Sequence, residues 1–138
     1  MKYLSFTIIA LGVFLTLYAC KQNNDHQTAK QPTMADVQIE AFEKAIADKE
    51  HTILLDVRTT KEFDGGHIAN AINIDVKEDS FRKECVKQLP KGKVVAVYCR
   101  SGFRSRSAGH ILNEEGFDVI NLKGGIIAWE EAGKDVVR

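Results

Sequence analysis

Short apolar runs alternate with amphipathic stretches along this chain from about residue 35 onward. Apolar, β-branched runs predict buried strands, and apolar residues at every third or fourth position predict helices. We expect strands at 36–38, 52–57, 71–74, 93–98 and 118–121, and helices at 40–49, 80–89, 104–115 and 126–132. Alternation of this kind predicts an α/β domain with a parallel sheet and helices on both faces.

The opening of the chain follows a different pattern. Lys2 precedes a mostly apolar stretch from Leu4 to Tyr18, which is typical of a signal segment and shorter than the roughly twenty residues of a membrane-spanning helix. The segment ends in Leu-Tyr-Ala-Cys at 17–20, which resembles a bacterial lipobox and implies a lipid attached to Cys20 after cleavage. The alternative is an uncleaved anchor. Both interpretations predict a cell-envelope protein held at a membrane and facing the periplasm.

Residues 20–33 are polar and lack a large apolar side chain that could anchor them to a core. We therefore expect a lipoprotein-type signal peptide over 1–19, a flexible tether over 20–33 and one domain over 34–138. Lysine plus arginine and aspartate plus glutamate each number 19. Without a basic stripe, this balance argues against a nucleic-acid partner, and the sequence shows no cluster of metal ligands or cofactor motif.

The segment around Cys99 carries the candidate chemistry. The apolar strand Val94–Tyr98 aims Cys99 into a turn of Arg100, Ser101, Gly102, Phe103, Arg104 and Ser105, after which a helix begins. Ligands bind beyond the carboxyl ends of parallel strands, where backbone N–H groups and the positive end of a helix favour negative charge. We expect Cys99 to be held there as a thiolate, with the two arginines gripping the oxygens of a small anion. The alternative is an inert buried cysteine.

Each remaining residue of this turn has an expected role. Gly102 supplies a positive φ at the bend. Ser101 and Ser105 either bond the anion or cap the helix, and capping is the favoured role for Ser105. Phe103 either shields the sulfur or faces the core at the start of the helix.

Loop length narrows the chemistry. Four residues separate Cys99 from Arg104, one fewer than in protein tyrosine phosphatases, so the ring is tight for a tetrahedral phosphate. At this loop the chain resembles the rhodanese family of sulfurtransferases. Further matching segments follow the family order: Leu54–Arg58 with Glu62 and Phe63, then Gly66–Ile74, and finally Leu122–Trp129.

The resemblance implies a three-layer α/β fold with a five-stranded parallel sheet. It also implies attack by Cys99 on the outer sulfur of a donor such as thiosulfate, followed by transfer to a nucleophilic acceptor such as a thiol or cyanide. Storage of sulfur on Cys99 as a persulfide predicts two half-reactions without a cofactor.

Four polar residues outside the loop are candidate supporting residues: Asp56, Arg58, Glu62 and His67. We interpret them as structural rather than catalytic, with Arg58 pairing with Glu62 across a short turn and His67 bonding loop backbone. Cys85 is expected to pack as a small hydrophobic residue, although a disulfide with Cys99 is an alternative.

Three functions remain open at this point. The leading one is a sulfurtransferase, followed by an envelope persulfide or thiol relay and by a rhodanese-like interaction module without thiosulfate turnover. A phosphatase or arsenate reductase is a distant fourth because of the loop length.

Overall fold

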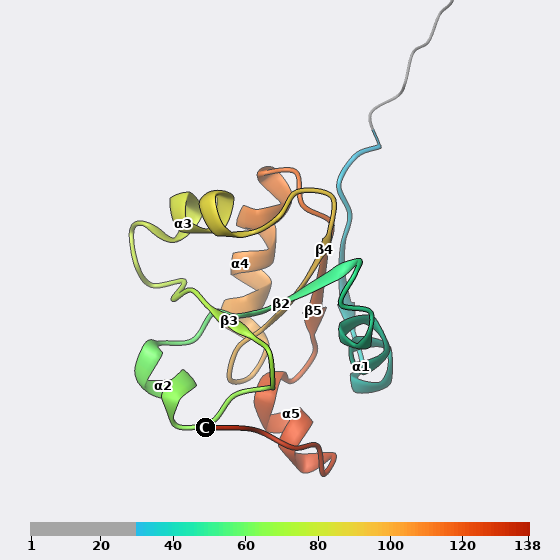
Figure 1. The fold of residues 1–138 in the computed structure, drawn as a ribbon, viewed down its shortest axis with the longest axis vertical. Helices are drawn as coiled ribbons and strands as arrows, with labels where there is room; N and C mark the ends of the chain where they lie inside the picture. Colours follow the sequence, from blue (N-terminus) through green and yellow to red (C-terminus); the bar gives the residue numbers. More distant parts are fainter. Residues whose placement is uncertain (1–29) are drawn as a thin grey trace, which may run out of the picture.

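The computed structural model describes residues 30–138, which form a five-stranded sheet with helices around it (Figure 1). The elements follow in the order β1 (Met34–Val37), α1 (Ile39–Ala47), β2 (Thr52–Asp56), α2 (Thr60–Asp64), β3 (Ile72–Asn73), α3 (Phe81–Gln88), β4 (Val94–Tyr98), α4 (Phe103–Glu114), β5 (Val119–Leu122) and α5 (Gly125–Glu131).

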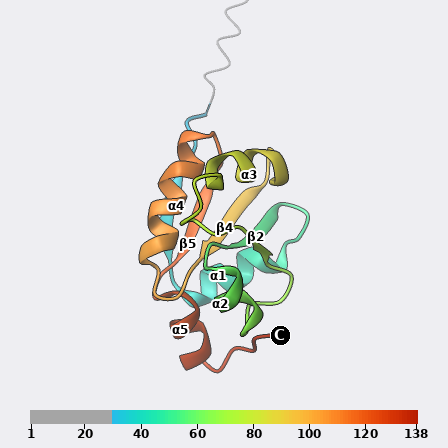
Figure 2. The same cartoon turned by 90° about the vertical axis from the view of Figure 1, so that its left-hand side faces the viewer.

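All strand pairs in the sheet are parallel, and the strand order is β1-β5-β4-β2-β3. Helices α3 and α4 pack on one face of the sheet and helices α1 and α5 on the other, as the two separate apolar clusters show (Figure 2). This is the three-layer α/β arrangement expected from the sequence. Strand β4 lies in the middle, so its carboxyl end opens between neighbours on both sides.

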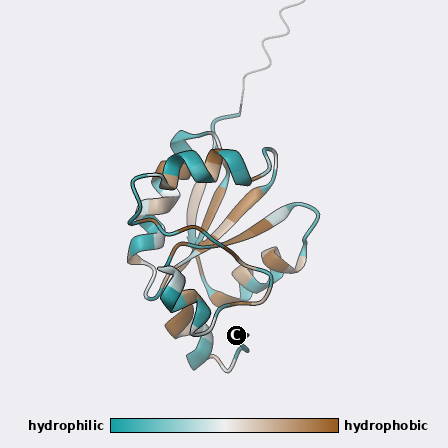
Figure 3. Ribbon diagram, turned by 60° about the vertical axis from the view of Figure 1, so that its left-hand side comes forward, coloured by the Kyte–Doolittle hydropathy of each residue, from teal (hydrophilic) through white to brown (hydrophobic). Residues whose placement is uncertain are grey.

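Strand β4 is buried on both faces because its side chains alternate between the two clusters. Val95 and Val97 belong to the cluster under α3 and α4, whereas Ala96 and Tyr98 belong to the cluster under α1 and α5. The apolar colouring of the strands between the helices in Figure 3 follows from this pattern. Cys99 continues the alternation and belongs to the first cluster.

The helices lie within two residues of the expected bounds at each end, and two other details differ from expectation. Strand β1 begins at Met34, two residues before the expected start. The helix α2 was not predicted, because five residues are too few to show a helical period; it begins with a capping box between Thr59 and Glu62.

Thr33, expected in the tether, is fixed to the domain: its N–H and hydroxyl both donate to Asp118, at 2.7 and 2.8 Å. The expected signal segment, Cys20 and the tether before residue 30 lie outside the described residues. Within residues 30–138, no helix has the length and apolar character needed to cross a membrane.

Candidate active site around Cys99

The Cys99 thiol lies directly after β4 and is 1% exposed. Two donors point at its sulfur: the Gly102 N–H at 3.1 Å and the Ser105 hydroxyl at 3.3 Å. Hydrogen bonds donated to sulfur favour the ionised form over the neutral thiol. The sequence prediction of N–H groups around Cys99 is therefore confirmed for Gly102, and a hydroxyl supplements it.

The turn is bent at Gly102, which has a φ of 90° and precedes the first residue of α4. A Cβ at this position would lie 3.1 Å from both the Gly124 nitrogen and the Leu122 oxygen, so the predicted need for glycine is confirmed on both conformational and steric grounds. The first hydrogen bond of α4 runs from the Arg106 N–H to the Gly102 oxygen. The N–H groups that precede it at this helix end are the donors to which anions bind in other proteins.

The amino end of α5 packs against the same turn and donates hydrogen bonds to it. The N–H groups of Ile126 and Ile127 donate to the Cys99 and Arg100 oxygens, at 2.9 and 3.2 Å. Gly125 permits this approach, because a Cβ there would lie 2.5 Å from both of these oxygens. Sequence reasoning treated the glycine pair at 124–125 as a simple turn and missed its contact with the cysteine loop.

Asn121 is a second residue that sequence reasoning missed. Its side-chain nitrogen donates to Asp36 at 2.9 Å and to the Gly102 oxygen at 3.3 Å, and its side-chain oxygen has no hydrogen-bond partner within the described part of the chain. An asparagine inside a short apolar strand was the available signal, because a buried polar side chain needs a partner. Asn121 thus joins the strand β5 to the bend of the loop.

The ion pairs around the loop differ from the predicted ones. Arg58 does not pair with Glu62; it holds Asp56 with distances of 2.6 to 3.0 Å, and the Arg58 side chain is 6% exposed. Glu62 instead binds Arg104, with both terminal guanidinium nitrogens donating to its two oxygens at 2.9 and 2.7 Å. The Arg104 hydrogen bonds lower the pKa of Glu62 to about 2.

The remaining predicted residues have clear places. Ser105 is the third residue of α4 and donates to the Cys99 sulfur, so its expected capping role is wrong and Gly102 takes the cap position. Phe103 is 79% exposed, which contradicts a core-facing position. Arg100 and Ser101 are exposed on the loop.

His67 and Cys85 lie outside the cysteine loop. The His67 Nδ1–H donates to the Phe63 oxygen at 3.0 Å, which confirms its predicted bond to backbone. Cys85 is buried with a free thiol, as is Cys99, and burial raises the pKa of Cys85 to about 12. Cys85 thus packs as expected, without the alternative disulfide.

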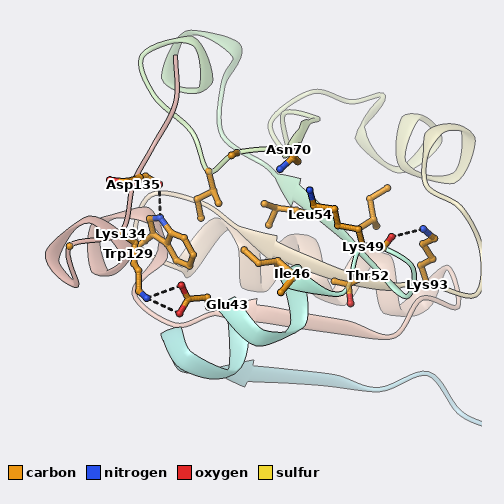
Figure 4. A pocket seen from close by; sticks show the side chains of 15 residues that line it. Glu43, Ile46, Lys49, Thr52, Leu54, Asn70, Lys93, Trp129, Lys134 and Asp135 are labelled. Atoms are coloured by element: carbon orange, nitrogen blue, oxygen red, sulfur yellow. Dashed lines mark hydrogen bonds and ion pairs between the residues drawn. The ribbon is translucent and has the colours of Figure 1, made fainter.

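The surface of residues 30–138 includes a groove beside the loop and a larger hollow away from it. A groove of about 380 Å³ borders the loop and contains Lys61, Glu62, Arg100, Ile127 and Arg138 among its lining residues. A larger hollow of about 570 Å³ lies between α1, β2 and the end of α5, with Ile46, Leu54 and Trp129 on its walls (Figure 4). None of its lining residues belongs to the 99–105 loop. The smaller groove is adjacent to the loop, because Arg100 lines it.

Taken together, the loop offers one thiol, two donors to its sulfur and free helix-end N–H groups, with no group of three metal-ligating side chains anywhere in residues 30–138. Such a site can attack an electrophilic atom and stabilise the anion that departs.

Comparisons with known proteins agree with this geometry. The family described as rhodanese-like domain matches residues 38–132. The chain is 36% identical over 103 residues to a sulfurtransferase of Allochromatium vinosum, covering 74% of this chain and 94% of that protein. It is 39% identical over 97 residues to a tRNA uridine(34) hydroxylase of Cytophaga hutchinsonii, but spans only 31% of that protein. The crystal structure of a rhodanese-related protein from Thermoplasma volcanium matches with a TM-score of 0.62 and 33% identity, over 75% of this chain and 97% of that one.

Proposed function

Because this chain belongs to the rhodanese-like family, we propose that it transfers sulfane sulfur from a donor such as thiosulfate to a nucleophilic acceptor through a persulfide on Cys99. The observation that carries the proposal is the pair of hydrogen bonds to the Cys99 sulfur, from the Gly102 N–H and the Ser105 hydroxyl. A buried thiol with an apolar role does not need two donors, whereas a nucleophilic sulfur does.

In the first half-reaction the Cys99 thiolate forms a bond to the outer sulfur of thiosulfate. The sulfur–sulfur bond of thiosulfate breaks, and its electron pair leaves with sulfite. The negative charge stays on the terminal sulfur of the new persulfide, where the amino end of α4 favours it. A thiol or cyanide then attacks that terminal sulfur and regenerates the Cys99 thiolate.

The two arginines of the loop differ in how many of their N–H groups are available to an incoming anion. Arg100 is exposed and lines the groove beside the loop, so its guanidinium is available to the oxygens of an incoming anion. Arg104 uses two of its N–H groups on Glu62, and a guanidinium has five donors in total. The Phe103 side chain is exposed beside the loop, and we propose that it shields the persulfide from water.

The decisive experiment is intact mass spectrometry after incubation with thiosulfate. We expect a gain of about 32 mass units, the mass of one sulfur bound covalently to a nucleophile. Cyanide should remove the added mass, and the Cys99→Ser variant should never acquire it. A wild-type protein that stays unmodified by thiosulfate but accepts sulfur from a protein persulfide supports the relay function instead. One that accepts sulfur from neither supports an interaction module.

The location of the protein in the cell is a separate proposal, and it rests on the sequence before residue 30. We propose that lipid on Cys20 holds the domain in the cell envelope, facing the periplasm. The amino-terminal peptide of the protein, extracted from the membranes of an expressing bacterium, should then begin at Cys20 and carry added acyl mass. A peptide that still contains the residues before Cys20, without added mass, contradicts lipid attachment and leaves an uncleaved anchor.

A further inference from the structure

Glu62 forms an ion pair with Arg104, one of the two arginines of the cysteine loop. Its two carboxylate oxygens accept from the two terminal nitrogens of Arg104 at 2.9 and 2.7 Å, although the residues lie 42 positions apart in the chain. The side chains are 31% and 23% exposed, so the pair is partly shielded from water. Bidentate pairs of this kind are geometrically specific.

The carboxylate of Glu62 is itself fixed in place. Its Oε2 accepts from the Thr59 N–H at 3.1 Å and from the Thr59 hydroxyl at 3.0 Å, which completes the capping box of α2. Glu62 is therefore held by its own helix end, and Arg104 is held by Glu62. This order indicates that the pair is built into the free site rather than formed after a substrate arrives.

Arg104 is close enough to the nucleophile for its charge to matter there. The hydrogen bonds that Arg104 donates to Glu62 raise the pKa of Arg104, and coulombic interactions with Cys99 and Asp75 add to this effect. An unpaired guanidinium at this place attracts anions strongly. A guanidinium beside a carboxylate forms a pair without net charge, and its attraction falls off much faster with distance.

We propose that Glu62 determines the charge preference of the Cys99 site, because it neutralises Arg104 and thereby disfavours small dianions relative to sulfur donors of low charge. This inference rests on the sulfur transfer proposed above and names the preferred donor class: an organic persulfide without charged groups near its sulfur. In that reaction the Cys99 thiolate bonds to the outer sulfur of the persulfide, the sulfur–sulfur bond breaks, and the donor leaves as a thiolate.

The first test does not require sulfur transfer at all. The full chain is alkylated with iodoacetate, which is anionic, and separately with iodoacetamide, which is neutral, and the peptide that carries Cys99 is quantified by mass spectrometry. Glu62→Gln should raise the ratio of the iodoacetate rate to the iodoacetamide rate by about two- to fivefold, the range for one partly exposed charge interaction. Added salt should reduce this difference.

Thr59→Ala is the matched control, because it removes the hydroxyl of the capping box while leaving the charges of Glu62 and Arg104 in place. We expect its alkylation ratio to stay within about twofold of wild type, inside the small range of exposed charge effects. A ratio that rises equally in both variants means that the change comes from loss of the capping box and not from loss of the Glu62 charge. A ratio that is unchanged or lower in Glu62→Gln overturns the inference.

The second test compares donors. Glu62→Gln should lower the KM for thiosulfate with little change in kcat, and it should give a smaller gain with an alkyl persulfide, which carries at most one negative charge. If no variant takes sulfur from either donor while the alkylation ratio still rises, the proposed function fails and the charge role of Glu62 stands. If sulfur transfer occurs but the KM for thiosulfate does not fall, the charge role fails and the function stands.

Discussion

Cys85 and Cys99 belong to the same apolar cluster and are equally enclosed, with 0% and 1% exposure. Cys85 lies within α3, and burial, with a smaller contribution from Glu84, raises its pKa to about 12. Cys99 lies where β4 ends, and its sulfur receives an N–H and a hydroxyl. The difference shows that exposure does not separate the two thiols; the donors supplied by a strand end and a helix start do.

The largest difference between the two cysteines is expected when each thiol is removed in turn by mutation. Cys99→Ser should abolish the mass gain with thiosulfate, because the attacking sulfur is gone. Cys85→Ala should keep the full gain and lose only about 1 kcal/mol of stability, since it removes one small buried group. Intact mass spectrometry and urea unfolding measure both quantities. Sulfur found on the Cys85 peptide contradicts the assignment.

The next largest effect is expected from the residue that presents the N–H group to Cys99. Gly102→Ala adds strain of about 1–2 kcal/mol from its positive φ and a Cβ at 3.1 Å from two backbone atoms. We expect sulfur loading to slow more than about tenfold as the N–H moves away from the sulfur.

Gly92→Ala is the control for Gly102→Ala. Gly92 has a φ of 85°, but a Cβ there meets no atom within 4 Å. This variant should carry the conformational strain and still load sulfur at the wild-type rate. Equal losses of loading in the two variants mean that the approach of Gly102 to the sulfur has no special role. Thermal unfolding gives the strain, and rapid-quench mass spectrometry gives the rate.

A smaller effect is expected from the second donor. Ser105→Ala removes the hydroxyl at 3.3 Å from the sulfur, and a hydrogen bond to a charged acceptor contributes about 1.5–3 kcal/mol. Loading should slow by about tenfold, which corresponds to the lower end of this range, with the fold intact. Ser107→Ala, on the exposed side of the same helix, should leave the loading rate unchanged. A fully active Ser105→Ala protein makes the hydroxyl dispensable.

The smallest effect concerns the ion pair between Glu62 and Arg104 near Cys99. The pKa of Glu62 is lowered from 4.5 to about 2, so its ionised form stabilises the fold above about pH 4.5, and this stabilisation is lost as the pH falls through about 2. Urea midpoints of wild type should therefore exceed those of Glu62→Gln at pH 5, and the two should converge near pH 2. A constant difference across this range contradicts the ion pair.

Much of the fold was predictable because β2 and β4 carry apolar runs, and such runs identify buried parallel strands. The position of Cys99 at a strand end followed from the same pattern. Helix α2 was harder to predict because it is too short to show a helical period. The spacing of Thr59 and Glu62 was nevertheless a signal of a helix start.

The partners of the charged residues were not predictable from local spacing. Arg58 and Glu62 lie four positions apart, which favours a local pair, yet Asp56 takes Arg58 in a buried position and leaves Glu62 to Arg104. Arg58 pairs with Asp56 because the fold buries these two side chains together, and a buried charge needs an opposite charge beside it. The expected capping role of Ser105 was wrong because α4 begins at Phe103, two residues before Ser105.

The contact of α5 with the Cys99 turn has a consequence for the order in which the site forms. The N–H groups of Ile126 and Ile127 hold the turn, and β1 has its only strand partner in β5 within the described sheet. A chain truncated before β5 leaves β1 unpaired and removes both of these hydrogen bonds from the turn. The turn around Cys99 is therefore complete only when the chain extends to Ile127.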